Sequence, residues 1–507
     1  MSDALGQARR TLGRARRKLH RLRHPEEAPA LRAEKAVSRL RRDLVAQLTQ
    51  LHRDVSRLDG AVATAGARLD KLDARSAAVS SGLDALARRP GPPPPPPRAP
   101  AKTLAANVLE DNVVLSGLQA DGPRPRVVIV LQGFGVHMLF AGIRTALLTA
   151  VELARRLDRP LAMVVLEPLN ADPDAVRTEV VQWLTDELDA ADVAANLTLS
   201  APEGIRRHGG HPDDIWMATF WTTAFQLGRL CDRGALSPDH VVYLIQDWEP
   251  GFYAWGTEHA LAGSTYSLRF HLLVNSSSLA DYVSERVGRP IPADQVIAPQ
   301  VDEDRLRSAT DEWAPRAPDS PRILFYARPS KPRNLYPLGL AALQQWALTV
   351  DPSAHPVVTL AGEDLTAPDL GPGITLEAVG KLDMDEYYAL LARTDVGLAL
   401  MHSPHPSHLA LELPMTGIPT ITNAVENHRK PWVTGLEVVE ATPHALAAAL
   451  TAHLERARTI TTHEFVPLGA TLGRPLGECL DALVTRLPAA GVPAGVHGLT
   501  STTKSVR

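Results

Sequence analysis

"RVVIVLQGFGVHMLFAGIRTALLTAVELARRLDRPLAMVVLE", residues 126–167, decides the fold class, because it holds a strand, a helix and a second strand in turn. The apolar runs at 126–132 and 161–167 predict buried strands, and the apolar spacing of "IRTALLTAVELARRL" between them predicts a helix. Two strands that are joined through a helix lie parallel, and the helix covers one face of their sheet.

The same alternation continues along most of the chain. Further apolar runs predict strands at 196–200, 215–219, 241–246 and 270–276, and then at 322–327, 356–362, 375–380, 396–401 and 419–423. Strands that alternate with helices indicate an α/β fold of parallel sheets covered on both faces. The two series predict two Rossmann-like domains, at 102–302 and 303–490, with a cleft between them at the carboxyl ends of the strands.

The bulk composition is that of a soluble globular protein, with 45% hydrophobic and 22% charged residues in 507. The net charge of −4 argues against nucleic-acid binding. Two cysteines, Cys231 and Cys479, cannot form a disulfide framework, which favours a reducing compartment. No apolar run approaches the roughly 20 residues of a membrane span, and no signal peptide begins the chain. We therefore expect a cytoplasmic protein.

Residues 1–89 differ in composition from the rest of the chain. From Leu44 to Leu86 a four-three spacing of apolar and small residues continues without interruption. Such a repeat predicts a coiled coil, and hence a homo-oligomer formed through residues 37–89. Glycines at 60, 66 and 82 would weaken it, and a lone solvated helix is the alternative.

Two segments flank this repeat. The basic stretch "RRTLGRARRKLHRLRH" at 9–24 has leucines at helical spacing, which suits peripheral contact with an anionic membrane, although a solvated charged helix has the same pattern. The proline run within 90–101 predicts a semi-rigid linker to the first domain. Residues 491–507 are expected to form a flexible tail.

Two loops at predicted strand ends suit a phosphate group. Arg328, Lys331 and Arg333 follow the strand at 322–327, where clustered cations would neutralise a diphosphate. A solvated basic turn is the alternative. The glycine-containing loop that ends at Gly142 precedes a helix whose first amides are free, although a plain strand–loop–helix turn explains the spacing equally well.

The stretch "MHSPHPSHLALE", residues 401–412, places three histidines after a strand. It lacks the cysteines and the His–carboxylate spacing of common metal sites, so we expect no metal there. His405 is instead predicted to donate a hydrogen bond to a phosphate or a sugar hydroxyl. Glu412 would accept hydrogen bonds from a ribose diol, or it is an exposed helix carboxylate.

The stretch "QDWEPGFYAWGTE", residues 246–258, combines acids and aromatic rings just past a strand. Aromatic rings stack on the apolar face of a sugar, and carboxylates bind its hydroxyls, so this composition indicates the lip of a sugar-binding cleft. The alternative is an aromatic cluster that packs a long loop, with the acids as caps. The side chains concerned are Asp247, Trp248, Glu249, Phe252, Tyr253 and Trp255.

These motifs, in this order, resemble a known family over about residues 105–435. "RPSKPRN" (328–334) and "VGKLDMDEYYALLARTDVGLALMHSPHPSHLALELPMTGIPTITN" (379–423) resemble family-four retaining glycosyltransferases of the GT-B fold. In the first half, "MLFAGIRTALL", "DIWMATFWTTA", "VVYLIQDWEPGFYAWGTEHALAGSTYSL" and "LLVNSSSLADYV" resemble the WsaF-type rhamnosyltransferases that build bacterial surface polysaccharides. The resemblance implies an acceptor domain at 102–302 and a donor-nucleotide domain at 303–490.

The resemblance also implies roles for residues of the donor half. Arg328 and Lys331 would hold the donor diphosphate, assisted by Arg333. Glu412 would bind the nucleotide ribose. The backbone at Lys381 and Leu382 would meet the base.

One position departs from the family pattern. The family carries a second acid eight positions before the one at Glu412, and this chain has Pro404 there. His405 and Ser407 are therefore expected to supply the sugar contacts. From the first domain, the loop at Gly142 would approach the donor phosphates.

The resemblance implies a retaining mechanism in which the departing diphosphate takes the acceptor's proton. No protein nucleophile or metal is then required, because cations stabilise the leaving group. The expected catalytic residues are Asp247, Glu249, Arg328 and Lys331. The expected acceptor-binding residues are Trp248, Phe252, Tyr253 and Trp255.

The expected activity is transfer of a deoxysugar, rhamnose from dTDP-rhamnose, to a glycan or lipid-linked acceptor at the cytoplasmic face of the membrane. Two alternatives stay open. One is a non-catalytic scaffold that binds glycans or sugar nucleotides and is organised by its coiled coil. The other is a different family-four transfer, such as that of mannose or glucose.

Overall fold

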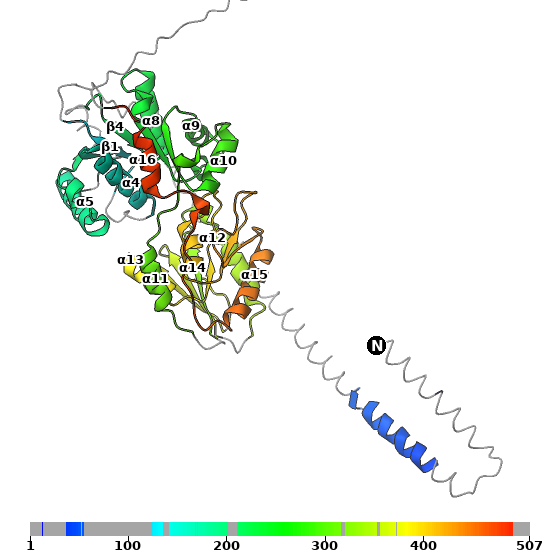
Figure 1. Ribbon diagram of the computed structural model, residues 1–507. Helices are drawn as coiled ribbons and strands as arrows, with labels where there is room; N and C mark the ends of the chain where they lie inside the picture. The colour runs from blue at the N-terminus through cyan, green and yellow to red at the C-terminus, as the bar shows by residue number, and fades with distance from the viewer. Residues whose placement is uncertain are drawn as a thin grey trace, which may run out of the picture. The chain divides into compact units, whose positions relative to one another are not determined.

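The computed structural model describes Gly13 and residues 37–51, 53–54, 124–134, 141–167, 169, 171–200, 210–315, 320–351, 355–371 and 373–489. The chain divides into two compact units, Met1–Ala101 and Lys102–Arg507 (Figure 1). The predicted basic helix at 9–24 apart from Gly13, the repeat beyond residue 54, the linker at 90–101 and the tail at 491–507 lie outside the described residues.

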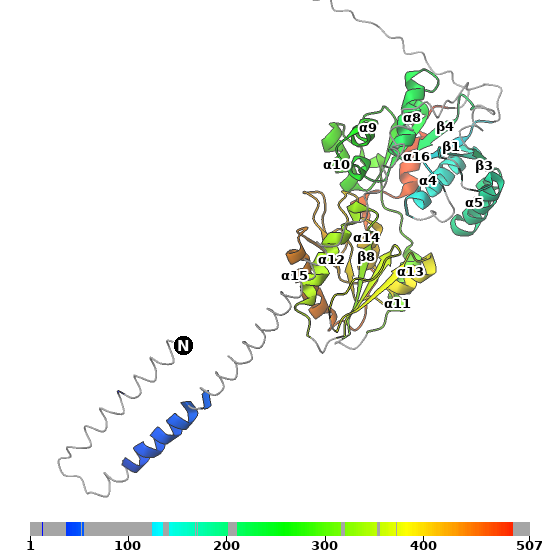
Figure 2. The same cartoon turned by 180° about the vertical axis from the view of Figure 1, so that it is seen from behind.

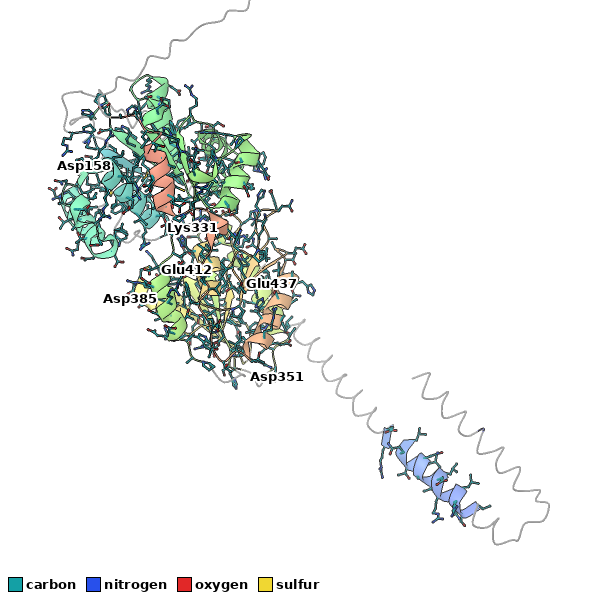
Figure 3. The ribbon with its side chains drawn as sticks, viewed as in Figure 1. Asp158, Lys331, Asp351, Asp385, Glu412 and Glu437 are labelled. Atoms are coloured by element: carbon teal, nitrogen blue, oxygen red, sulfur yellow. The ribbon has the colours of Figure 1, made fainter. Side chains whose placement is uncertain are left out.

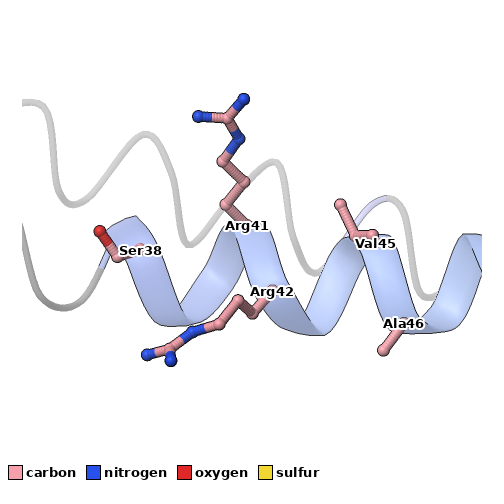
Figure 4. Close-up of a pocket in the computed structure, with 5 residues that line it drawn as sticks. All are labelled: Ser38, Arg41, Arg42, Val45 and Ala46. Carbon is pink, nitrogen blue, oxygen red and sulfur yellow. The ribbon is translucent and has the colours of Figure 1, made fainter.

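In the first unit, residues 37–51 and 53–54 are helical. Five apolar side chains between Val37 and Leu51 are 40–57% exposed. Figure 4 shows a hollow on this helix, lined by Ser38, Arg41, Arg42, Val45 and Ala46. None of the predicted site residues lies there. The coiled coil itself stays a prediction.

The second unit begins with a seven-stranded parallel sheet in the order β3-β2-β1-β4-β5-β6-β7. Its strands are β1 (Val127–Leu131), β2 (Leu161–Val165), β3 (Thr198–Ser200), β4 (Ile215–Ala218), β5 (Val241–Ile245), β6 (His271–Asn275) and β7 (Val296–Ile297). Its helices are α4 (Ala141–Leu157), α5 (Pro173–Leu188), α6 (Ala191–Ala194), α8 (Trp221–Asp232), α9 (Thr257–Thr265) and α10 (Ser277–Val287). The strand–helix–strand unit predicted from residues 126–167 is confirmed.

Alternate residues of β1 enter two different cores, because successive strand side chains point to opposite faces. Ile129 packs in the core that includes α4 and α5. Val128 packs in the core that includes α8 and α10. The sheet is therefore buried on both faces, which explains its nearly continuous apolar strand sequences.

A second parallel sheet follows, in the order β10-β9-β8-β11-β12-β13. Its strands are β8 (Arg322–Ala327), β9 (Val357–Gly362), β10 (Thr375–Gly380), β11 (Val396–Leu398), β12 (Thr420–Asn423) and β13 (Leu436–Val439). Its helices are α11 (Glu303–Asp311), α12 (Tyr336–Ala347), α13 (Met384–Leu391), α14 (His408–Met415) and α15 (Pro443–Ala457). Short 3₁₀ helices are η2 (Pro238–His240), η3 (Glu249–Phe252), η4 (Ala293–Gln295), η5 (Pro332–Asn334) and η6 (Ala470–Leu472).

Both sheets have the strand order of a doubly wound fold, which reverses between β1 and β4 and again between β8 and β11. The prediction of two Rossmann-like halves in the GT-B arrangement is confirmed. Ligands of such sheets bind outside the carboxyl ends of the strands at the point of reversal. The loops after β8 and β11 are therefore the first place to look for a site.

The opposite, amino edge of each sheet carries the same buried ion pair. Arg126, at the start of the first sheet, donates its backbone N–H and its guanidinium to Asp214, with both distances 2.7 Å. In the second sheet, Arg322 donates to Asp395 in the same way, from the backbone at 2.8 Å and from Nη2 at 2.5 Å. Each pair ties the first strand of a half to the turn that precedes the neighbouring strand.

The last helix packs on the first half, although the predicted domain bounds assigned residues 303–490 to the second half. Helix α16 (Leu476–Val484) packs its apolar face in the core of the first sheet, beside α4. Arg156 of α4 donates to Asp481 at 2.8 Å. Figures 1 and 2 show α16 near α4 from both sides. An amphipathic pattern predicts that a helix buries one face, and it does not say against which core.

Candidate functional site

The predicted cation loop lies at the reversal point of the second sheet, directly after β8. The Nε atoms of Arg328 and Arg333 are buried, and neither has a hydrogen-bond partner among the described residues. Lys331 is exposed, and Figure 3 labels it together with Glu412. Buried guanidinium donors without partners are uncommon, because burial removes their water. They are consistent with an anionic ligand at this loop.

An acid that sequence analysis did not single out holds this loop in place. Glu363, just after β9, accepts hydrogen bonds from the backbone N–H of Ser330 at 2.8 Å and from the Ser330 hydroxyl. These hydrogen bonds lower the pKa of the Glu363 carboxyl. Gly362 makes room for the arginine, because a Cβ added there would lie 2.8 Å from Cγ of Arg328. These contacts hold the loop after β8 in a defined position at the edge of the sheet.

Lys381 and Leu382 follow β10 at the same edge. Burial lowers the pKa of the Lys381 ammonium, and the nearby positive charge of Arg328 lowers it further. Leu382 packs against the core of the second half. The structure therefore brings the predicted base-binding segment close to the predicted diphosphate-binding arginine.

Arg333 and Asp247 join the two halves of the second unit. Nη1 of Arg333 lies 3.6 Å from Oδ2 of Asp247, and its guanidinium carbon lies 4.2 Å from the ring centre of Phe252. The Ser403 hydroxyl, from the loop after β11, donates to Oδ1 of Asp247. The acidic and aromatic stretch of the first half thus meets both cation and histidine loops of the second.

Glu249, predicted to be catalytic, is turned inward. It is 2% exposed, and its Oε2 accepts from the Trp221 backbone N–H at 2.5 Å and lies 3.4 Å from the Tyr243 hydroxyl. Burial raises the pKa of the Glu249 carboxyl well above its ordinary value. The side chain satisfies the first free amide of helix α8 and supports the loop from within, as the alternative interpretation of this stretch expected.

Some of the predicted acceptor aromatics pack inside the loop, and one of them is exposed. Trp248 stacks on Tyr266, with ring centres 5.0 Å apart, and packs against the core that includes α8 and α10. Tyr253 accepts a hydrogen bond from Nε1 of Trp221 at 2.9 Å. Trp255 is 93% exposed and stacks on His259, 5.2 Å between centres. Trp255 presents an open ring face, whereas Trp248 belongs to the packing of the loop.

Glu412 is buried in the first turns of α14. Its Oε2 accepts a hydrogen bond from the Tyr387 hydroxyl, and its Oε1 lies 3.5 Å from Nδ1 of His408. Burial raises the pKa of Tyr387, so this phenol stays a donor. The carboxylate is oriented by two side chains, and each of its oxygens keeps lone pairs for a further donor. Sequence analysis missed Tyr387.

The loop between β11 and α14 holds the remaining predicted sugar contacts. His405 and Ser407 are both buried, and the Ser407 N–H donates to Nδ1 of His405 at 3.1 Å. Burial lowers the pKa of His405 well below its ordinary value. Arg429, which sequence analysis also missed, donates to the backbone of this loop. The sequence around Arg429 does not indicate this contact, because Arg429 lies far from the loop in the sequence.

The first turn of α4 completes the arrangement. The Gly142 carbonyl accepts from Nε2 of Gln246 at 2.9 Å, which ties this turn to the loop of Asp247. The charge of Arg144 acts on the phenol of Tyr388 in α13 and opposes the pKa increase that burial causes there. The rest of the glycine-containing loop, at 135–140, lies outside the described residues.

The arrangement can bind an anion and stabilise negative charge that develops on a leaving group. Within the described part of the chain, no three His, Cys, Asp or Glu side chains group as metal ligands. Among the same residues, no helix is both long and apolar enough to cross a membrane.

Family models match both halves of the second unit. The N-terminal domain of WsaF matches residues 126–274, and the C-terminal domain of WsaF matches residues 321–451. Together they cover more than half of the 507 residues. The O-antigen biosynthesis protein RfbC of Myxococcus xanthus is 29% identical over 343 residues, 66% of this chain. The chain spans 25% of the length of that relative.

The chain is also similar, at low identity, to several solved structures. Sucrose-phosphate synthase from Thermosynechococcus elongatus has 14% identity and a TM-score of 0.42, covering 71% of this chain and 94% of that one. HepE of Anabaena in complex with UDP has 10% identity and a TM-score of 0.42, covering 71% and 95%. α,α-Trehalose 6-phosphate synthase from Burkholderia multivorans has 12% identity and a TM-score of 0.43, covering 72% and 98%.

Proposed function

Because the chain belongs to the WsaF family of glycosyltransferases, we propose that it transfers a deoxysugar, rhamnose from dTDP-rhamnose, in the synthesis of a bacterial surface polysaccharide. The acceptor is a glycan or a lipid-linked glycan at the cytoplasmic face of the membrane. The observation that carries this proposal is the pair of buried, unpartnered guanidinium nitrogens of Arg328 and Arg333 at the carboxyl edge of the second sheet.

In the proposed reaction, the bond between the anomeric carbon and the diphosphate oxygen breaks as the acceptor oxygen forms its bond to the same carbon. The acceptor oxygen attacks on the same face of the sugar from which the diphosphate departs, and its proton passes to that diphosphate, so configuration is retained without a protein nucleophile. Arg328 and Lys331 stabilise the charge on that leaving group and make a metal unnecessary. The products are a nucleoside diphosphate and the extended glycan.

The other predicted residues take supporting parts in this proposal. Glu412 binds the ribose, and the backbone at Lys381 and Leu382 meets the base. The amide of Gly142 approaches the phosphates. On the acceptor side, Trp255 offers its exposed face for stacking. Asp247 lies 3.6 Å from Arg333 at the junction. Its Oδ1 accepts the Ser403 hydroxyl and the Trp248 N–H, so Oδ2 is the oxygen that remains for an acceptor hydroxyl.

A panel of nucleotide sugars tests the function directly. The purified protein is expected to bind dTDP-rhamnose and to release dTDP from it, faster when a polysaccharide or lipid-linked acceptor is added. Release of nucleotide from a mannose or glucose donor instead would identify a different family-four transfer. Binding without any turnover would favour the non-catalytic scaffold. If no nucleotide sugar binds, the proposed function is wrong.

The N-terminal helix is proposed to form a homo-oligomeric coiled coil through residues 37–89, because Leu44, Leu48 and Leu51 are each at least 40% exposed in the single chain. Removal of residues 1–100 is expected to leave a folded monomer, whereas the full chain forms oligomers. Light scattering after gel filtration measures both masses. An intact chain that is already monomeric would contradict this. Contact of residues 9–24 with membranes is proposed from their basic charge and their leucines at helical spacing.

A further inference from the structure

The loop at 403–407 is fixed by both halves of the second unit. Ser403 donates its hydroxyl to Asp247 of the first half. Ser278, in the first turn of α10, donates its hydroxyl to the Pro404 carbonyl at 2.9 Å. The backbone N–H of His405 donates to the Ser403 oxygen at 3.0 Å. Most polar groups of this loop therefore already have hydrogen-bond partners.

A buried arginine clamps the same loop from behind. Nη2 of Arg429 donates to the carbonyls of Ser403 and His405, at 2.9 and 3.0 Å, and Nη1 donates to the Thr422 hydroxyl at 2.6 Å. Burial lowers the pKa of Arg429 to about 10, so the group keeps its charge near neutral pH. Its two carbonyl contacts lie on either side of Pro404 and hold the backbone of the loop that carries His405.

Two buried polar atoms in this network have no hydrogen-bond partner among the described residues, Nε of Arg429 and Nε2 of His405. His405 is 6% exposed, and its Nδ1 uses its lone pair to accept the Ser407 N–H. The ring hydrogen must therefore sit on Nε2. Nε2 is buried and has no hydrogen-bond partner among the described residues. Ser407 has φ of 72°, a strained backbone value for a non-glycine residue, in the same loop.

The surroundings keep this ring neutral. Burial lowers the pKa of His405 well below its ordinary value, and the positive charges of Arg333 and Arg429 act in the same direction. Asp247 is the acid nearest along the network, and its Oδ1 is occupied by the Ser403 hydroxyl. His405 is therefore an uncharged donor of a single hydrogen bond.

We propose that His405 is a specificity-determining residue, which donates its Nε2 hydrogen to one hydroxyl oxygen of the donor sugar, and that Arg429 is the positioning residue that aims it. The inference rests on the proposed function, because it takes this site to bind a nucleotide sugar. A neutral donor suits an uncharged hydroxyl, whereas the charged loop at 328–333 suits the diphosphate. The site would therefore distinguish sugars by the hydroxyl at one ring position.

Two substitutions separate the roles of the two ring nitrogens. His405→Asn keeps an acceptor for the Ser407 N–H but lacks a group that reaches the Nε2 position. His405→Gln places an amide N–H near the Nε2 position. Calorimetric titration gives the dissociation constants of dTDP and dTDP-rhamnose for each. His405→Asn is expected to bind dTDP as the wild type does and to bind dTDP-rhamnose about tenfold more weakly, since a lost hydrogen bond of ordinary strength is worth about that factor. His405→Gln is expected to recover part of the loss.

The outcomes separate the inference from the function on which it rests. Equal weakening of both ligands by His405→Asn would place the contact on the phosphates and overturn the inference. Unchanged binding of both would overturn it as well. If the wild type binds neither dTDP nor dTDP-rhamnose, the proposed function fails, and the inference fails with it.

A measurement on the wild type avoids any effect of a substitution on folding. Nitrogen NMR of ¹⁵N-histidine-labelled protein is expected to show His405 as the Nε2–H tautomer. The Nε2 signal is expected to shift with dTDP-rhamnose and to stay unchanged with dTDP. A protonated ring, or the same shift with both ligands, would overturn the inference.

The role of Arg429 is tested by the same comparison of the affinities for dTDP and dTDP-rhamnose. Arg429→Gln is expected to weaken dTDP-rhamnose binding while the affinity for dTDP is kept, and Arg429→Lys is expected to restore binding in part. A purely structural role would reduce the affinity for both ligands together, and that result would remove Arg429 from the proposal.

Discussion

Arg328→Ala is expected to lower kcat for sugar transfer by about 10²–10³-fold, the usual effect of removing one group that stabilises transition-state charge. The physical reason is the buried Nε of Arg328, which has no partner among the described side chains and would lose its contact with the departing diphosphate. Initial rates of dTDP release from dTDP-rhamnose measure the loss. Arg328→Lys is expected to recover only part of the rate, because an ammonium group cannot reproduce the planar guanidinium contacts.

The matched control is Arg393→Ala. Arg393 is an exposed arginine of the same half, in the turn between α13 and β11 at the amino edge of the sheet. Its substitution is expected to leave the rate unchanged. If the double variant of Arg328→Ala with Glu412→Ala binds the donor as tightly as the wild type, the assignment of this edge as the donor site is wrong.

Asp395→Ala is expected to lower the free energy of unfolding by about 3–5 kcal/mol, the usual cost of removing one partner of a buried ion pair. Asp395 accepts the backbone N–H and the guanidinium of Arg322, so its loss leaves a charge and an amide unpaired in a largely buried place. Urea unfolding, followed by tryptophan fluorescence, measures the change. Asp214→Ala, in the matching position of the first sheet, is expected to have an effect of similar size.

Asp385→Ala provides the control for this second prediction. Asp385 pairs with Arg305 at 2.8 Å, but its side chain is 92% exposed. Exposed ion pairs add little stability, because water screens both charges. A loss of stability in Asp395→Ala no larger than in Asp385→Ala would show that the pair at the sheet edge is not a stabilising feature. Transfer activity per folded molecule should remain in Asp395→Ala, because Asp395 lies at the amino edge of the sheet, opposite the candidate site.

Several features of the fold were predictable because they depend on local periodicity. The apolar run at 126–132 and the helical spacing after it predicted β1 and α4, and the structure has them at Val127–Leu131 and Ala141–Leu157. The position of Arg328 and Lys331 just after a strand was equally predictable from the sequence. Burial on both faces of a parallel strand leaves a continuous apolar run in the sequence, so no tertiary information was needed.

The docking of α16 was not predictable in this way. The spacing of its leucines predicts a buried face, but the helix could pack against any of several cores in the chain. The structure places it on the first half, where Asp481 meets Arg156. Likewise, nothing near residue 429 in the sequence points to the carbonyls of Ser403 and His405, more than twenty residues away.

The sequence by itself determined the two parallel sheets and the loops that carry charge at their carboxyl ends, since hydrophobic periodicity and strand ends are local properties. Only the tertiary structure decided which side chains of those loops meet the other half. Asp247 and Glu249 are two residues apart in one acidic stretch, yet Asp247 meets Arg333 of the other half and Glu249 caps α8 inside the first. Their difference arises from what packs around each carboxyl group, and that packing is contributed by segments far away in the chain.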